Sequence, residues 1–347
     1  MSSLIKNLHI QNFKSVRDLS IECERINIFI GKPNAGKSNI LEAISLLGVN
    51  YPKMDDRGKF LETTLRYRTL THLFNNFNFR APIEISANNN ITAVLREGIP
   101  NADFVFQVSS ATPIPLGIGK EKTGFFIPSI TIMLKANGEL QSAASTNDPI
   151  ISSVKRYEFR GIVEDKKNGF QLEPPHGNNF YSIVEAYPDI RSEIQQFLKP
   201  NGLEFLIDVE SQRMAVVQKT ETSLLSFPLS LVPDTFQRYI FHLAAIMSNR
   251  SSVLLFEEPE SHSYAPYVYQ LAQHILDDEG GNQYFITTHN PYLLTPILQD
   301  GKKDVALFVT WFENYETLAR RLSEEEVSDI LNYGMDIFLN LDNFIPE

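Results

Sequence analysis

Hydrophobic and polar positions follow two different periods along this chain. Residues 25–30 form a short β-branched and aromatic run, and residues 39–47 carry apolar side chains at helical spacing. From about residue 82 to residue 217 the pattern changes to short alternating runs separated by Asn, Gly and Pro clusters, which predict antiparallel strands. These runs are residues 83–87, 104–108, 130–134, 203–207 and 213–217. One helix, residues 182–198, is predicted among them.

Strands and helices alternate again in the last third of the chain. Residues 252–256 and 282–288 are typical of buried strands, and the helical segment 266–276 between them predicts a parallel βαβ unit. A further strand is predicted over residues 304–312, followed by a helix that Ser323 and Glu326 open as a capping box.

These patterns predict an α/β protein with two parts. Residues 1–80 and 226–347 would form the α/β domain, because the buried strands and their connecting helices lie there. Residues 81–225 would form an inserted, mainly antiparallel β lobe with one helix.

The segment between the first predicted helix and the strand before it, residues 31–38, meets every fixed position of the phosphate-binding loop G-x-x-x-x-G-K-[ST]. In such a loop Lys37 neutralises phosphate oxygens and the Ser38 hydroxyl binds Mg²⁺, so ATP and Mg²⁺ are the predicted cofactors. A glycine-rich surface turn is the alternative, but it would not need this strand and helix. The expected nucleotide-binding residues are Gly31, Asn34, Ala35, Gly36, Lys37, Ser38 and Asn39.

Two adjacent carboxylates, Glu257 and Glu258, follow the predicted strand 252–256. The carboxyl end of a parallel strand is where ligands bind in open α/β folds. Glu257 would hold the hydrated Mg²⁺, and Glu258 would orient or deprotonate the water that attacks the γ-phosphate. Taken alone, such a pair is equally typical of a solvated loop start or of a helix N-terminus.

His289 follows the second strand of the βαβ unit. Because parallel strands end at the same sheet edge, it should lie beside the carboxylates and can donate a hydrogen bond to a γ-phosphate oxygen. Lys37, Glu258 and His289 are therefore the candidate catalytic residues, with Ser38 and Glu257 as candidate metal ligands.

Composition and charge limit the partners. The chain has 347 residues, 43% of them hydrophobic, and a formal net charge of −11, which disfavours tight nucleic-acid binding but leaves a local basic patch possible. The small basic cluster at residues 155–157 is interpreted as a solvated lobe edge. No apolar run is long enough to span a membrane, and the N-terminus lacks the pattern of a signal peptide, so we expect a cytoplasmic protein. Cys23 is the only cysteine, which excludes internal disulfides.

The three motifs together resemble the ABC-type ATPases of the SMC, RecF and OLD superclass, in particular its compact prokaryotic group. The resemblance begins at residues 8–15, where Lys14 matches a basic residue that approaches the nucleotide. It implies that Glu257 and Glu258 are the Walker B acid and the catalytic base, and that His289 is the switch histidine. It also implies ATP-dependent assembly of two or more copies.

The chain departs from this family at the signature loop, which caps the nucleotide of a partner subunit. Residues 228–238 contain no glycine, and Ser230 lies two residues too early relative to Arg238, so that Val232 takes the serine position. Ser230 remains the candidate for the nucleotide contact, and a purely packing helix is the alternative. For the glutamine loop, Asn75 and Asn76 are the candidates.

Two further features shape the functional expectation. No heptad pattern persists, so coiled-coil arms are not expected, and the chain has no room for a Toprim nuclease. The resemblance therefore suggests the ATPase component of an anti-phage system such as PARIS or Septu, a homo-oligomeric switch that controls a separately encoded Toprim nuclease, HNH nuclease or toxin. The alternatives are a RecF-like DNA-repair clamp and an ATP-stabilised scaffold with little turnover.

Overall fold

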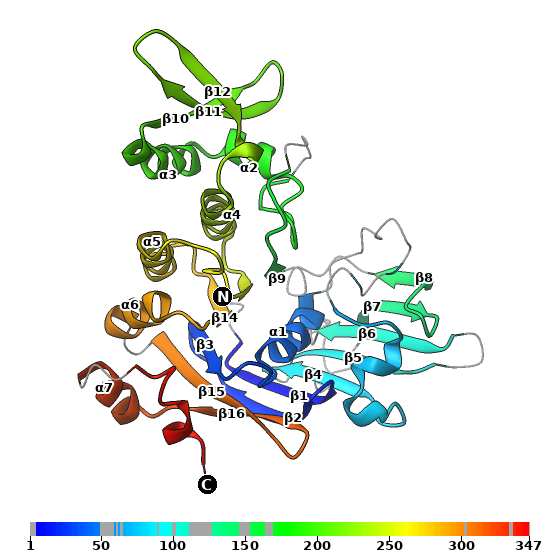
Figure 1. Ribbon diagram of the computed structural model, residues 1–347. Helices are drawn as coiled ribbons and strands as arrows, with labels where there is room; N and C mark the ends of the chain where they lie inside the picture. Colours follow the sequence, from blue (N-terminus) through cyan, green and yellow to red (C-terminus); the bar gives the residue numbers. More distant parts are fainter. Residues whose placement is uncertain are drawn as a thin grey trace, which may run out of the picture.

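The computed structural model describes residues 5–48, 59, 62, 65–88, 90–98, 102–110, 127–145, 153–163, 169–301, 304–332 and 336–346. Two large β-sheets with helix α1 (Lys37–Ser45) between them form the lower part of the molecule in Figure 1. The predicted α/β class is confirmed, and no helix of the described ranges extends into a coiled-coil arm. None of the described helices has the length and apolarity needed to cross a membrane.

The central sheet has the strand order β16-β15-β3-β14-β13-β9. All of its strands run parallel except β16, which forms a hairpin with β15. The strands are β3 (Ile26–Gly31), β9 (Val154–Tyr157), β13 (Val253–Glu257), β14 (Gln283–Thr287), β15 (Val305–Glu313) and β16 (Glu316–Arg321). Because they run parallel, the carboxyl ends of β9, β13, β14 and β3 meet at one edge of the sheet.

Both faces of the central sheet are covered, which explains why its inner strands are almost continuously apolar. Along β3, Ile26, Ile28 and Ile30 pack toward one group of helices, whereas Phe29 packs toward α1 and the second sheet. The covering helices are α4 (Asp234–Ser248), α5 (Ala265–Leu276) and α6 (Pro291–Gly301), and α7 (Glu324–Asn332) lies at the end beside α6.

The second sheet is antiparallel, with the order β2-β1-β4-β5-β6-β7-β8. Its strands are β1 (Asn7–Phe13), β2 (Val16–Glu22), β4 (Ile83–Ala87), β5 (Ile91–Glu97), β6 (Phe104–Ser110), β7 (Ile127–Leu134) and β8 (Leu140–Ser145). β4 pairs directly with β1, so the strands predicted for the inserted lobe extend a sheet that the first hairpin begins.

A small third layer lies beyond α4, at the top of Figure 1. It contains α2 (Phe180–Ala186), α3 (Pro188–Leu198) and a three-stranded sheet of β10 (Leu203–Asp208), β11 (Arg213–Lys219) and β12 (Leu224–Pro228). The prediction of one helix over residues 182–198 is wrong, because the chain leaves the helical conformation at Tyr187. Pro188 follows Tyr187, and a residue before proline disfavours the α conformation.

Residues 81–225 are thus distributed over three places rather than gathered in one lobe. Strands β4 to β8 join the β1–β2 hairpin, β9 enters the central sheet beside β13, and the segment from α2 to β12 forms the third layer. The physical reason is edge pairing: β1 and β13 each have an edge that needs a hydrogen-bonded neighbour, and strands from this stretch provide it. Short 3₁₀ turns cover Leu46–Gly48, Leu70–Leu73, Asn75–Phe77, Lys199–Asn201, Leu229–Leu231 and Leu341–Phe344.

Candidate nucleotide-binding site

An open cavity of about 760 Å³ lies at the carboxyl edge of the central sheet. Residues 33–39 of the glycine-rich loop form one wall, and Glu257, Glu258 and His289 form the opposite side. Ser15, Arg66 and Phe312 complete the lining. The structure therefore brings together the loop lysine, the strand-end carboxylates and the histidine, which are up to about 250 residues apart in the sequence.

Backbone carbonyl groups of the glycine-rich loop hold the Lys37 side chain in place. Lys37 is buried, and its Nζ donates hydrogen bonds of 3.0 Å to the carbonyl oxygens of Gly31 and of Lys32. Burial lowers the pKa of Lys37, and the charges of Glu258 and Glu257 act in the opposite direction. A phosphate that enters the cavity would replace the two carbonyl oxygens as acceptors of the Lys37 hydrogen bonds. The Lys37 ammonium is already positioned for this contact.

Gly36 can only be glycine in this arrangement. Its φ is +91°, and a Cβ atom would lie 1.8 Å from the Oγ1 atom of Thr317 on β16. The loop is therefore in direct contact with the β15–β16 hairpin, which leaves no space for a side chain.

Ser38 and Glu257 both line the cavity, and the Ser38 hydroxyl is close enough to Glu257 to affect its pKa. Burial would raise the pKa of Glu257, but the Ser38 hydroxyl and the nearby Arg156 and Arg66 charges outweigh it and lower the pKa. A hydroxyl and an ionised carboxylate are hard oxygen donors, so this pair fits Mg²⁺. The described residues contain no group of three or more His, Cys, Asp or Glu side chains that could hold a metal, so phosphate and water would have to supply the other ligands.

Two arginines contact the same carboxylate, and sequence reasoning missed both. Arg156 of β9 forms a buried ion pair with Glu257, and the Nη2 atom of Arg66 lies 3.5 Å from the Oε2 atom of Glu257. The interpretation of residues 155–157 as a solvated edge is wrong, since Lys155 and Arg156 are both buried. Val154 and Tyr157 flank them as apolar strand residues, which is the weak signal that could have indicated a strand.

Glu258 and His289 face each other across the sheet edge. The Nε2 atom of His289 lies 3.6 Å from the Oε1 atom of Glu258, and their side chains are 37% and 44% exposed. Burial and the Lys37 charge lower the pKa of His289, against the effect of Glu258, which favours the neutral imidazole. Glu258 has a φ of +43°, the left-handed region that favours glycine. Its backbone N–H donates to the Thr287 carbonyl at 3.0 Å, which holds this conformation.

Glu260 fixes the position of the backbone at His289. Its Oε1 atom accepts hydrogen bonds from the Thr288 hydroxyl and from the His289 backbone N–H, the latter at 3.2 Å. The side chain is buried, and Oε2 has no hydrogen-bond partner among the described residues. Burial raises the pKa of Glu260 to about 7. Sequence reasoning assigned no role to this residue, although it directly follows the carboxylate pair and Pro259.

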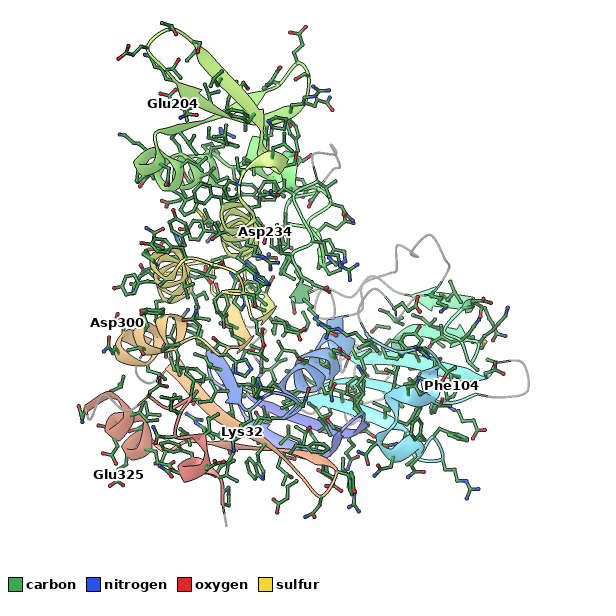
Figure 2. All side chains as sticks on the ribbon, viewed as in Figure 1. Lys32, Phe104, Glu204, Asp234, Asp300 and Glu325 are labelled. Atoms are coloured by element: carbon green, nitrogen blue, oxygen red, sulfur yellow. The ribbon has the colours of Figure 1, made fainter. Side chains whose placement is uncertain are left out.

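Five predicted residues, Lys14, Gly31, Asn75, Asn76 and Ser230, do not line the cavity. The Lys14 ammonium is held by the buried Glu42, and Gly31 contributes its carbonyl oxygen to Lys37. Asn75 is buried and donates to the Lys14 carbonyl at 2.8 Å, which makes it a support of the β1–β2 turn. Ser230 is exposed in the turn before α4. In Figure 2, Asp234 at the start of α4 lies far from Lys32 of the phosphate-binding loop.

Comparison with known proteins adds two family models and a homologue. Residues 4–95 match the family described as "AAA ATPase domain", and residues 141–295 match the one described as "AAA domain, putative AbiEii toxin, Type IV TA system". An ATP/GTP phosphatase of Helicobacter pylori is 22% identical over 330 residues, which cover 83% of this chain and 85% of that protein. An uncharacterised protein of Methanocaldococcus jannaschii is 50% identical over 44 residues, or 12% of this chain and 20% of that protein.

The fold is that of an SMC head. The structure of an SMC head bound to the C-terminal winged-helix domain of ScpA matches with a TM-score of 0.51 and 13% identity, over 93% of this chain and 99% of that one. The SMC head domain of Thermotoga maritima matches over 92% and 99%, with a TM-score of 0.41 and 14% identity. Two ATPase family models match parts of its sequence and the fold around its glycine-rich loop is that of an SMC head, so the chain is similar to ATPases of the ABC-type, SMC-like class.

Proposed function

We propose that this protein binds and hydrolyses ATP as an oligomeric switch. The observation that carries the proposal is the convergence of Lys37, Ser38, Glu257, Glu258 and His289 on one cavity. Each provides a group that phosphoryl transfer needs, namely charge compensation, metal ligands, a base and a hydrogen-bond donor. The H. pylori relative, named as an ATP/GTP phosphatase, supports the same chemistry.

The roles follow from the contacts. Lys37, already desolvated, would bind the β- and γ-phosphate oxygens, while Ser38 and Glu257 would hold Mg²⁺. The bound Mg²⁺ would offset the negative charge of the phosphates. Glu258 would orient the attacking water and accept its proton, and the neutral His289 would donate a hydrogen bond to a γ-phosphate oxygen. The Glu260 carboxylate keeps His289 in place by accepting a hydrogen bond from the His289 backbone N–H.

The assembly step rests on the exposure of the reacting groups. Glu258 and His289 remain about 40% exposed, so a single chain leaves the γ-phosphate open to water. A second copy would close the site, with Ser230 and the start of α4 as the surface that approaches the partner's nucleotide. Hydrolysis would then reopen the assembly. The likeness to an SMC head supports this arrangement.

The proposed biological setting is supported by the second family description. That family is described as a putative toxin of a toxin–antitoxin system, which supports a role in bacterial conflict. We place the protein in the cytoplasm, as the ATPase component of an anti-phage system in which ATP-dependent opening and closing controls a separate nuclease or toxin.

The proposal is tested by ATP hydrolysis together with size analysis in the presence of Mg²⁺. Wild type should hydrolyse ATP, Lys37→Ala should abolish hydrolysis, and Glu258→Gln should trap a larger ATP-bound assembly. Lys32→Ala is the matched control, because the Lys32 ammonium pairs with Asp342 at 2.6 Å outside the cavity. The absence of both turnover and ATP-dependent assembly in wild type would reject the switch. ATP-dependent DNA binding that weakens with salt would identify a DNA clamp instead.

A further inference from the structure

We infer that Phe312 is the platform on which the nucleotide base stacks, and that this site accepts ATP and GTP alike. The inference rests on the proposed function, since it assigns the base end of the same nucleotide site. It is carried by the juxtaposition of an exposed aromatic ring with the phosphate-binding loop inside one cavity.

Phe312 reaches the cavity because of its position in β15. Side chains at 308, 310 and 312 point to the face of the central sheet that carries α1. The ring of Phe308 stacks on Phe29 in the core at 4.9 Å between centroids. Two residues further, Thr310 is opposite Gly31, and its carbonyl oxygen would lie 2.1 Å from a Cβ atom on that glycine. The next residue on this face, Phe312, therefore projects past the sheet edge beside the loop.

The hairpin that carries Phe312 is rigidly attached to the loop and to the β1–β2 turn. Asn314 and Tyr315, with φ values of 49° and 65°, form the tight two-residue turn between β15 and β16. The Thr317 N–H donates to the Ser15 carbonyl at 2.7 Å, and the two hydroxyls lie 2.6 Å apart. An Arg17–Glu316 ion pair of 2.9 Å adds a further link. Phe312 is thus held in a fixed place relative to the phosphate site, as a binding platform requires.

The Phe312 ring is exposed and is not part of the hydrophobic core. Half of its surface is accessible, although the other aromatic ring of this row, Phe308, is buried in the core. Single exposed apolar residues are common on protein surfaces, but this one lines a polar cavity that is built for phosphate. A flat, apolar ring at the open end of such a cavity is suited to the face of a purine.

The same geometry predicts little discrimination between adenine and guanine. Stacking tolerates any base, because every base has a π face. The two polar side chains at the foot of the hairpin are linked to it rather than aimed at the base, since Asn39 donates to the Ser15 hydroxyl at 2.7 Å and Ser15 bonds to Thr317. The feature that meets the base is then the face of the Phe312 ring, which does not read the edge of a purine.

The experiment measures the affinity of three probes by isothermal titration calorimetry in the presence of Mg²⁺. The probes are the non-hydrolysable imido analogues of ATP and of GTP, and inorganic tripolyphosphate. Phe312→Ala should weaken the binding of both nucleotides by about 5- to 150-fold, because that is the range of base stacking, and should leave tripolyphosphate binding unchanged. Phe312→Leu, which keeps apolar bulk without a ring, should behave like Phe312→Ala, and Phe312→Trp should bind both nucleotides like wild type. Phe170→Ala is the control, since Phe170 is 89% exposed and lies outside the cavity.

The possible results separate this inference from the proposed function. Unchanged nucleotide affinity in Phe312→Ala would overturn the platform while leaving the phosphate site intact, and so would a loss confined to one of the two purines. A loss of tripolyphosphate binding equal to that of the nucleotides would show that Phe312 only supports the loop. Wild type that binds none of the three probes would reject the phosphate site itself, and the platform with it.

Discussion

Arg156 and Glu257 form a largely buried ion pair between the neighbouring parallel strands β9 and β13, and Glu257 lines the same cavity as Ser38. The permanently charged Arg156 guanidinium is thus in contact with Glu257, the proposed metal ligand. It keeps Glu257 ionised and fixes its orientation, because a buried carboxylate without a partner would be protonated or would turn toward water.

Removing this arginine should destabilise the fold. Arg156→Met leaves the Glu257 charge largely buried, so the free energy of unfolding should fall by about 3 kcal/mol in urea titrations at pH 7. Arg160→Met is the control, because Arg160 is on the same segment in an exposed pair with Glu158 and should change stability by less than about 1 kcal/mol. The difference should shrink in acid, as the pH falls through the lowered pKa of Glu257 and the carboxyl becomes neutral. Equal stability of the two variants at pH 7 would contradict the role of this pair.

The left-handed backbone of Glu258 predicts a conflict between stability and activity. Glycine adopts this conformation without steric cost, so Glu258→Gly should raise the free energy of unfolding by about 1 kcal/mol. The same change removes the proposed base and should abolish ATP hydrolysis. Glu258→Gln serves as the comparison, since it should also abolish hydrolysis without the gain in stability. A Glu258→Gly protein that is no more stable than Glu258→Gln would show that the conformation stores no strain.

The pKa of His289 should shift in opposite directions when each of its two charged neighbours is replaced by an uncharged residue. Because the Lys37 charge lowers the pKa of His289 and Glu258 raises it, Lys37→Met should shift the pKa upward and Glu258→Gln should shift it downward. Histidine-selective NMR measures both shifts. His176 is the internal reference, since its pKa is lowered by burial and is affected by Glu158, Arg160 and Arg156 instead. Shifts of the same sign in the two variants would mean that the three side chains do not lie as described.

Glu260 should make the protein less stable as the pH rises. Its folded pKa of about 7 is above the ordinary value for a glutamate, so the folded state holds the proton more tightly and stability falls between roughly pH 4.5 and 7. Glu260→Gln keeps an oxygen for Thr288 and His289 but cannot ionise. It should remove this fall, which amounts to roughly 3 kcal/mol at most. Urea unfolding of both proteins from pH 5 to pH 8 tests this, and parallel curves would reject a protonated Glu260.

Several elements could be predicted because their cause is local. The predicted strand, glycine-rich loop and helix are present as β3, residues 32–36 and α1, and the βαβ unit is formed by β13, α5 and β14. The Ser323–Glu326 capping box is present, with Ser323 N–H to Glu326 at 2.8 Å and Glu326 N–H to Ser323 at 3.2 Å. In each case the stabilising contacts join residues a few positions apart, or follow from an apolar strand that must be buried.

Strand β9 shows where local reasoning fails. Lys155 and Arg156 interrupt its apolar pattern, and a charged pair in a short segment ordinarily indicates solvent. Here each charge has a distant buried partner, since Lys155 donates to Asn249 and Arg156 pairs with Glu257. Buried charges are tolerated only when such partners are present, and a sequence does not reveal which residues will meet.

The sequence by itself therefore determined which chemical groups the candidate site contains, through the loop around Lys37 and the strand-end residues Glu257, Glu258 and His289. Only the tertiary structure decided what surrounds this chemistry. Arg156 reaches Glu257 across 101 positions, and Thr317 bonds to Ser15 across 302, which places Phe312 beside the loop. The physical reason is that a motif is set by hydrogen bonds and steric limits within a few residues. Strand order and edge pairing, in contrast, bring together side chains that no local pattern connects.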